Sequence, residues 1–236
     1  MKLLKTSKLF VASMAVVGAG VAGILCTSSN TYAATTTLKA GDRIGYVGSG
    51  VDLCTVAAVG TDSLGNKLAL TAGHCVAVGQ RMTRLNAQGL FVPANQRTEI
   101  GVGAVSKITV TGATQPNKLD YGFVKLDNDV ELVSTGRSSV AAPVLWQSVT
   151  RIGNDLGFQV NQQTNITGYT TNDFTIAGSV APGASGGPVV TGDKLVGVAS
   201  RAAIFYGLPI TFITRADAAI ADVSSTGGIG TDFKPL

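Results

Sequence analysis

His74 is the only histidine in this 236-residue sequence, and it stands in the segment LTAGHC, residues 70–75, at the end of an apolar run. A histidine changes its protonation state near neutral pH, so it can act as a general base. A single histidine can equally be an ordinary structural side chain. A catalytic role therefore requires partners elsewhere in the chain.

Ser185 lies in the glycine-rich segment APGASGGPVV, residues 181–190. Such a stretch forms helices and strands poorly but makes tight turns, where a hydroxyl can project and backbone N–H groups can converge. Acyl transfer needs both a nucleophile and N–H donors to the developing oxyanion. The same glycines would also suit a turn without any chemical role.

Asp120 directly precedes the apolar run YGFVKL, residues 121–126. A carboxylate that starts a buried strand is expected to be partly buried itself and to need a hydrogen-bond donor. The alternative is a surface aspartate in a turn. A base, a nucleophile and a carboxylate are thus present, and the fold has to bring them together.

Short alternating or β-branched runs recur along the chain and are separated by turn signals such as LGN and TGDK, which predicts strands. The runs are RIGYV, CTVAAV, KLALTA, VSKITVTG, YGFVKL, TRIG, GFQV, FTIAG, GPVVTG, KLVGVAS and LPITFIT. A helical pattern appears only in TRADAAIADV, residues 214–223, where Thr214 and Asp217 form a capping-box start. The sequence therefore predicts an all-β fold with a short C-terminal helix and a loosely packed tail after it.

Residues 1–33 have the composition of a secretory signal peptide. Three lysines precede an uncharged apolar stretch, residues 9–25, and Thr31 and Ala33 supply small residues before Ala34. We expect cleavage after Ala33, a secreted product and no stable membrane span after the signal is removed. A retained membrane anchor is the alternative.

The charge balance predicts no nucleic-acid partner, because the formal net charge of +4 falls to about +1 when Lys2, Lys5 and Lys8 leave with the signal peptide. The segment GAGVAG, residues 18–23, matches a dinucleotide-binding pattern but lies in the part that is removed. We expect no cofactor and no metal. About two hundred residues remain, enough for one large all-β domain or two small barrels.

Two cysteines remain after the signal peptide, Cys54 and Cys75, in a chain bound for an oxidising compartment. We expect them to form a disulfide, which would fix the residue next to His74. Two buried free thiols are the alternative.

The sequence resembles the chymotrypsin-like serine proteases, in particular the small secreted bacterial members. The resemblance covers roughly residues 41–223 and rests on LTAGHC, LDYGFVKL and GASGGPVV in the order His, Asp, Ser, with KLVGVASR as the strand that lines the substrate cleft. It implies two six-stranded antiparallel Greek-key β-barrels with the active site between them and a short C-terminal helix. The expected division is a signal peptide (1–33), an N-terminal barrel (34–135), a C-terminal barrel with the helix (136–223) and a flexible tail (224–236).

The resemblance also implies a role for each of the three polar residues. His74 would take the proton of Ser185, Asp120 would orient the imidazole, and the N–H groups of Gly183 and Ser185 would hold the oxyanion. The expected function is that of a secreted, monomeric serine endopeptidase that acts on a protein or peptide substrate. A non-catalytic relative that binds a protein or peptide, and an esterase with the same triad, remain as alternatives.

Substrate preference follows from positions that the resemblance assigns to the primary pocket, with Ser179 at its base and Ser200, Arg201 and Ala202 along its wall. Because position 179 has no carboxylate, we expect poor cleavage after Arg or Lys and a preference for small or medium uncharged residues. An acidic preference created by Arg201 is the rival.

Ala184 precedes the nucleophile where many members of the family have an aspartate. The ion pair that switches on many zymogens therefore cannot form here. The sequence alone does not show what orders the turn that carries Gly183.

Overall fold

The structure of the protein is a computed structural model that describes residues 35–47, 53–109 and 116–236. The predicted signal peptide, residues 1–33, lies outside the described residues. Within the described ranges, none of the helices has both the length and the apolar character needed to cross a lipid bilayer.

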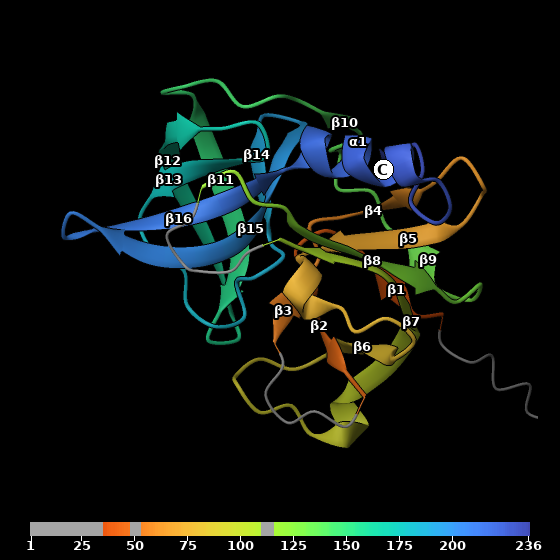
Figure 1. The fold of residues 1–236 in the computed structure, drawn as a ribbon. Coiled ribbons are helices and arrows are strands. Elements are labelled where there is room, and N and C mark those ends of the chain that lie inside the picture. Colours follow the sequence, from red (N-terminus) through yellow and green to blue (C-terminus); the bar gives the residue numbers. More distant parts are fainter. Residues whose placement is uncertain (1–34, 48–52, 110–115) are drawn as a thin grey trace, which may run out of the picture. The chain divides into compact units, whose positions relative to one another are not determined.

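The first large sheet is eight-stranded and is formed mainly by the N-terminal half of the described chain (Figure 1). Its order is β17-β4-β5-β8-β7-β6-β2-β3. Its strands are β2 (Arg43–Tyr46), β3 (Cys54–Thr55), β4 (Ala58–Thr61), β5 (Lys67–Thr71), β6 (Arg81–Leu85), β7 (Arg97–Ile108), β8 (Asp120–Leu126) and β17 (Lys234–Pro235).

This first sheet curls because β3, at one end of the strand order, and β4, next to β17 at the other end, belong to one bent segment, interrupted only by Val56 and Ala57. Val56 N donates to Asp42 O at 2.9 Å on one side, and Ala57 N donates to Leu70 O at 2.7 Å on the other. The bend thus connects the two ends of the sheet. Among the described residues, no continuous strand ladder closes the sheet.

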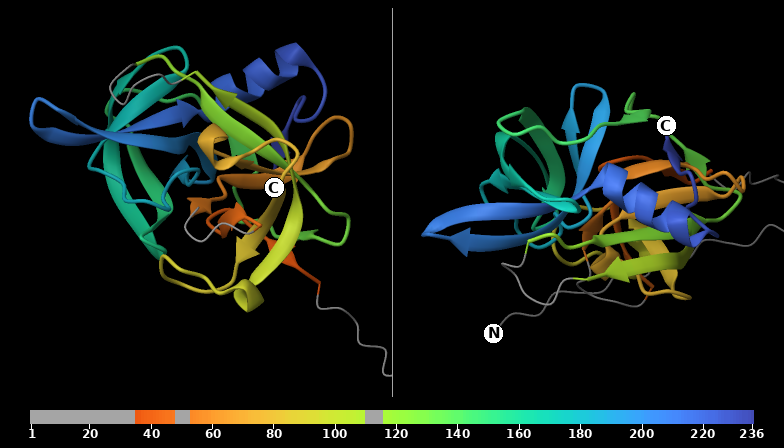
Figure 2. Two further views of the ribbon diagram at one scale, coloured as in Figure 1. Left: turned by 60° about the horizontal axis from the view of Figure 1, so that its bottom comes forward. Right: turned by 45° about the horizontal axis from the view of Figure 1, so that its top comes forward.

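The second sheet is seven-stranded in the order β10-β15-β14-β11-β12-β13-β16, and an additional β15–β16 pairing closes six of the strands into a barrel. Its strands are β10 (Ser139–Val140), β11 (Ser148–Asp155), β12 (Phe158–Tyr169), β13 (Asp173–Ala177), β14 (Pro188–Thr191), β15 (Lys194–Phe205) and β16 (Leu208–Arg215). The end of the β15–β16 hairpin projects from the barrel in both views of Figure 2. The predicted fold class, with two barrels and one short helix, is confirmed.

The remaining elements are short. Strands β1 (Thr37–Leu38) and β9 (Glu131–Leu132) pair in parallel, and the described residues also form the 3₁₀ turns η1 (Gly73–Cys75) and η2 (Ala94–Gln96). Helix α1 (Ala216–Thr226) follows β16 directly and buries Ala216, Ala219 and Val223 in the same apolar core as the first sheet.

The register of the strands brings the predicted site residues near one another. Thr71, at the end of β5, pairs with Gly122, near the start of β8. The segment that continues from β5 to His74 therefore begins beside Asp120. The first sheet also meets the second barrel here, because Asp120 N donates to Thr214 Oγ1 of β16 at 3.1 Å.

The C-terminal tail is packed, which corrects the expectation that residues 224–236 are loose and flexible. Phe233 is 3% exposed, and its ring packs edge-to-face on Phe123 at a centroid distance of 5.1 Å. Lys234 and Pro235 then pair with β4. The polar and glycine-rich composition of the tail does not indicate this packing, because the attachment consists of contacts with segments that are distant in the sequence.

Candidate active site

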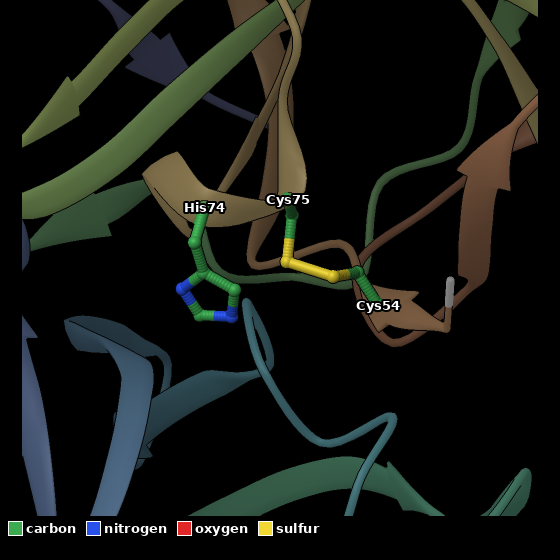
Figure 3. Close-up of side chains that lie close together, drawn as sticks. All are labelled: Cys54, His74 and Cys75. Carbon is green, nitrogen blue, oxygen red and sulfur yellow. A yellow bond between two sulfur atoms is a disulfide. The ribbon is translucent and has the colours of Figure 1, made fainter. Parts of the chain in front are cut away.

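His74 stands in the short 3₁₀ turn η1 that follows β5, and Figure 3 shows its imidazole projecting beside the Cys54–Cys75 disulfide. Its side chain is 41% exposed. Its Nδ1 lies 2.8 Å from Asp120 Oδ2, and its backbone N donates to Asp120 Oδ1 at 3.0 Å. The residue before His74 has to be a glycine, because a Cβ at position 73 would lie only 2.5 Å from the backbone oxygen of Lys107.

Asp120 is 3% exposed at the start of β8. Besides the two hydrogen bonds from His74, it accepts one from Ser200 Oγ at 2.6 Å. Burial by itself would raise the pKa of Asp120, but the hydrogen bonds and charge of His74 and the hydroxyl of Ser200 hold that pKa below its ordinary value. The carboxylate is therefore ionised at neutral pH. It favours the imidazole tautomer with a proton on Nδ1, which leaves Nε2 as an acceptor.

Ser185 lies in a tight turn just before β14. A glycine on each side of it has a positive φ angle, Gly183 (+101°) and Gly186 (+83°). A Cβ at Gly183 would lie 2.2 Å from Asn154 O, and one at Gly186 would lie 2.0 Å from Thr71 Oγ1. The turn needs glycine at both positions for conformation and for space. Within the described part of the chain, the N–H groups of Gly183 and Ser185 have no hydrogen-bond acceptor.

A pocket of about 200 Å³ lies at this place and is lined by both halves of the described chain. The lining residues are Gly45, Tyr46, Leu53, Cys54, His74, Cys75, Pro182, Gly183 and Ser185. One cavity is thus lined by the residues that carry a hydroxyl, an imidazole and two backbone N–H groups. Together they have the chemical groups needed for acyl transfer through a serine nucleophile.

The predicted disulfide between Cys54 and Cys75 is confirmed, and it ties β3 to η1 with Cα atoms 6.1 Å apart. Sulfur and nitrogen atoms of Cys54, His74 and Cys75 lie within 4.8 Å of one another, a spacing that metal ligands also show. The two sulfurs are bonded to each other and cannot be thiolate ligands, and His74 Nδ1 is engaged by Asp120. This cluster is therefore a structural support for His74.

Removing the disulfide should lower the free energy of unfolding. Cross-linking residues 21 apart restricts the unfolded chain and contributes about 3 kcal/mol in the chain-entropy model. We expect a Cys54→Ser, Cys75→Ser double variant to lose about this amount in a urea titration monitored by fluorescence. A double variant with the stability of the unmodified protein would show that the constraint does not stabilise the fold.

The four residues assigned to the primary pocket do not line the cavity around Ser185. Ser179 is exposed after β13, and Ala202 pairs with Thr211 in the β15–β16 ladder. Ser200 is 2% exposed, and its hydroxyl is engaged with Asp120. The structure thus joins Ser200 to the His74–Asp120 pair.

Arg201 contacts Asp173 and Phe212, both on the second barrel. Its guanidinium lies 3.5 Å from Asp173 Oδ2 and 4.2 Å from the centre of the Phe212 ring. Burial lowers the pKa of Arg201, and the charge of Asp173 opposes that effect. The cation therefore already has a carboxylate partner within the protein.

The family model described as Trypsin matches residues 52–220, which is more than half of the chain. The chain belongs to the trypsin family. No curated protein matches it in sequence. The order of the trypsin-family motifs and the two-barrel structure thus agree with the family match.

Solved structures of serine proteases share this trypsin-family fold. The crystal structure of Nocardiopsis protease (NAPase) is 20% identical, with a TM-score of 0.56 and coverage of 79% of this chain and 96% of that chain. Cellulomonas bogoriensis chymotrypsin is 20% identical, with a TM-score of 0.54 and coverage of 79% and 95%. A glutamic acid-specific serine protease, which uses a histidine triad in substrate binding, is 17% identical, with a TM-score of 0.56 and coverage of 84% and 100%. At these identities the similarity shows the fold.

Sequence reasoning missed Thr55, which contacts the Ser185 turn, and Asn154, which contacts Thr55. Thr55 Oγ1 donates to Gly183 O at 2.7 Å, and Asn154 Nδ2 donates to Thr55 Oγ1 at 3.1 Å. Both side chains are buried. No local motif marks either residue, because each acts on a segment that is distant in the sequence.

Proposed function

We propose that this trypsin-family protein is a secreted serine endopeptidase that works through an acyl-enzyme. The observation that carries the proposal is the 2.8 Å hydrogen bond between His74 Nδ1 and Asp120 Oδ2, beside a pocket lined by His74, Gly183 and Ser185. The family match and the fold of the solved proteases support a peptide substrate.

In the proposed reaction, Ser185 Oγ attacks the scissile carbonyl carbon while His74 Nε2 accepts the hydroxyl proton. The N–H groups of Gly183 and Ser185 stabilise the negative charge on the carbonyl oxygen. The imidazolium then gives its proton to the leaving amine, and the C–N bond breaks. Water, deprotonated by His74 Nε2, then attacks the acyl carbon; the bond to Ser185 Oγ breaks, the acid product leaves, and the imidazolium returns its proton to Oγ. Asp120 stays ionised and orients the imidazole throughout.

Two alternatives use the same fold. A non-catalytic relative would bind a protein or peptide, and loss of a triad residue is its usual sign; here all three residues are present. An esterase would use the same groups on an ester. Incubating the purified protein with matched peptide and ester substrates separates the three, and we expect hydrolysis of both. No hydrolysis of either, with tight binding of a peptide, would favour the non-catalytic protein.

Secretion and the domain division belong to the same proposal. A signal peptide at residues 1–33 would deliver the chain to an oxidising compartment, and the Cys54–Cys75 disulfide supports such a destination. The barrels would occupy residues 34–135 and 136–223, and the active protein would be a monomer. Edman sequencing of the exported protein should start at Ala34.

Cleavage after Arg or Lys should be poor, and small or medium uncharged residues should precede the scissile bond. The resemblance assigns the base of the primary pocket to Ser179, and a serine there supplies no carboxylate to pair with a substrate cation, which would be costly to bury without a partner. The rival acidic preference is disfavoured because Arg201 is paired with Asp173. A histidine triad like that of the glutamic acid-specific structural relative is not available, since His74 is the only histidine.

A peptide library read by mass spectrometry measures this preference directly. Dominant cleavage after Arg or Lys would contradict the assignment of Ser179. Dominant cleavage after Asp or Glu would show that Arg201 leaves Asp173 to meet the substrate.

Extra residues before Ala34 should not change the activity. Ala184 is fully buried and has no carboxylate with which a freed amino terminus could pair. We therefore expect equal kcat/KM for proteins that begin at Ala34 and at positions a few residues earlier. A product that is inert until it is trimmed at a later site would contradict this expectation.

A further inference from the structure

The N–H group of Gly183 belongs to the Pro182–Gly183 peptide bond. The carbonyl group of that bond accepts a hydrogen bond from a residue outside the turn. Pro182 O accepts a hydrogen bond from Leu156 N at 2.8 Å. Because a trans peptide is planar, its C=O and N–H groups point in opposite directions. The contact with Leu156 therefore fixes the direction of the Gly183 N–H group.

Thr55 holds the next part of the turn at two points. Its hydroxyl Oγ1 donates to Gly183 O at 2.7 Å, and its backbone N donates to Ser185 O at 2.7 Å. Thr55 is 0% exposed on β3 of the first sheet. One buried residue of the first sheet thus contacts the turn on both sides of Ala184.

Asn154 determines which way the Thr55 hydroxyl points. Its Nδ2 donates to Thr55 Oγ1 at 3.1 Å and to Gly41 O at 2.9 Å. A hydroxyl that accepts from an amide N–H is free to direct its single proton elsewhere, here to Gly183 O. Asn154 is 4% exposed, so water competes little for these groups.

The turn needs such support because Gly183 has φ of +101° and glycine has the widest choice of backbone conformations. A rotation of the Gly183–Ala184 peptide would break the Thr55 contact and disturb the neighbouring Pro182–Gly183 plane. Ala184 has no carboxylate with which to hold the turn by an ion pair.

We propose that Thr55 is a positioning residue, oriented by Asn154, that keeps the Gly183 and Ser185 N–H groups directed at the substrate oxyanion. The proposal rests on the proposed serine peptidase function. It identifies what orders this turn where an aspartate is lacking.

Thr55→Val keeps the shape of the side chain and removes the hydroxyl. We expect kcat for peptide hydrolysis to fall by about 30-fold, less than the ~10²–10³ lost with an oxyanion donor itself, and KM to change little. Affinity for a peptidyl boronic acid, whose tetrahedral adduct uses the same N–H groups, should fall by a similar factor. Thr55→Ser should restore both values, because it restores the donor.

Asn154→Asp tests the same network without altering Thr55. Its carboxylate can only accept, so it draws the Thr55 hydroxyl proton away from Gly183 O, and kcat should again fall with KM nearly unchanged. Thr83→Val is the matched control, since Thr83 is 3% exposed and its hydroxyl donates to Gly45 O at 3.2 Å. It removes an equivalent buried hydrogen bond and should retain kcat.

Amide hydrogen exchange gives a readout that does not depend on activity. The N–H groups of Ala184, Gly186 and Gly187 are hydrogen-bonded to Ala181, Ala199 and Ala184 carbonyls. Their exchange should accelerate in Thr55→Val and Asn154→Asp, and stay slow in Thr55→Ser and Thr83→Val.

Wild-type kcat in Thr55→Val, or equal losses in Thr83→Val, would overturn the proposal. Unchanged exchange of the turn amides in Thr55→Val would also overturn it. If the unmodified protein hydrolyses nothing, the proposed function fails, and the exchange of the turn amides still decides whether Thr55 orders the turn.

Discussion

Replacing Ser185 by alanine should lower peptide hydrolysis by about 10⁴- to 10⁶-fold, the scale on which a broken triad loses kcat. The hydroxyl is the only group at this position that can form the acyl-enzyme. Ser185 is buried only in part, so its loss should not unfold the protein. The measurement is kcat on a peptide substrate, with the melting temperature as a check of folding.

His74→Ala should cost a similar factor, and the Ser185→Ala, His74→Ala double variant should lose little more than either single variant. The residues act as a unit, so their contributions do not add. Ser225→Ala is the control, because its exposed hydroxyl donates within α1, to Asp222 O at 2.7 Å, and activity should be unchanged. Wild-type activity in Ser185→Ala would show that another residue performs the chemistry.

Asp120→Asn should lower kcat by about 10⁴-fold with little change in the shape of the site. If the new NH₂ group replaces Oδ2, it donates to His74 Nδ1 and selects the tautomer with a proton on Nε2, which cannot accept the Ser185 proton. If it replaces Oδ1, it opposes the backbone N–H of His74. The first orientation thus keeps a contact to the imidazole but with the wrong tautomer, and the second loses the hydrogen bond from the backbone of His74.

Asp62→Asn provides the matched control for this substitution. Asp62 is 5% exposed, and its carboxylate accepts backbone N–H bonds from Leu64, Asn66 and Gly230. Its amide variant should be less stable but should keep the activity of each folded molecule. Equal losses of kcat in the two variants would mean that Asp120 serves only to stabilise the fold.

The fold class and the residues of the site could be predicted because their signals are local. Alternating runs mark the strands, and the glycines around Ser185 mark a turn whose positive φ angles the structure shows. The disulfide could be predicted because two cysteines remain after the expected cleavage site. The strands and the turn depend on neighbours within a few positions, and the disulfide depends only on the number of cysteines that remain.

What could not be predicted depends on contacts between distant segments. Thr55 and Gly183 are separated by 128 positions, and neither residue type indicates the hydrogen bond between them. The resemblance assigned Ser200 to the wall of the substrate pocket, whereas in the structure its hydroxyl donates to Asp120, 80 positions away. The packed tail likewise depends on Phe233 meeting Phe123, a contact that sequence composition does not encode.

Covalent labelling with a fluorophosphonate tests the central claim most directly, because the probe reacts with a serine only when a base and an oxyanion site activate it. The purified protein and its Ser185→Ala variant would be treated with the probe, digested and mapped by mass spectrometry. The account predicts a single adduct, on Ser185, in the unmodified protein and none in the variant. A folded protein that takes up no probe, or a variant labelled as fast as the unmodified protein, would contradict it.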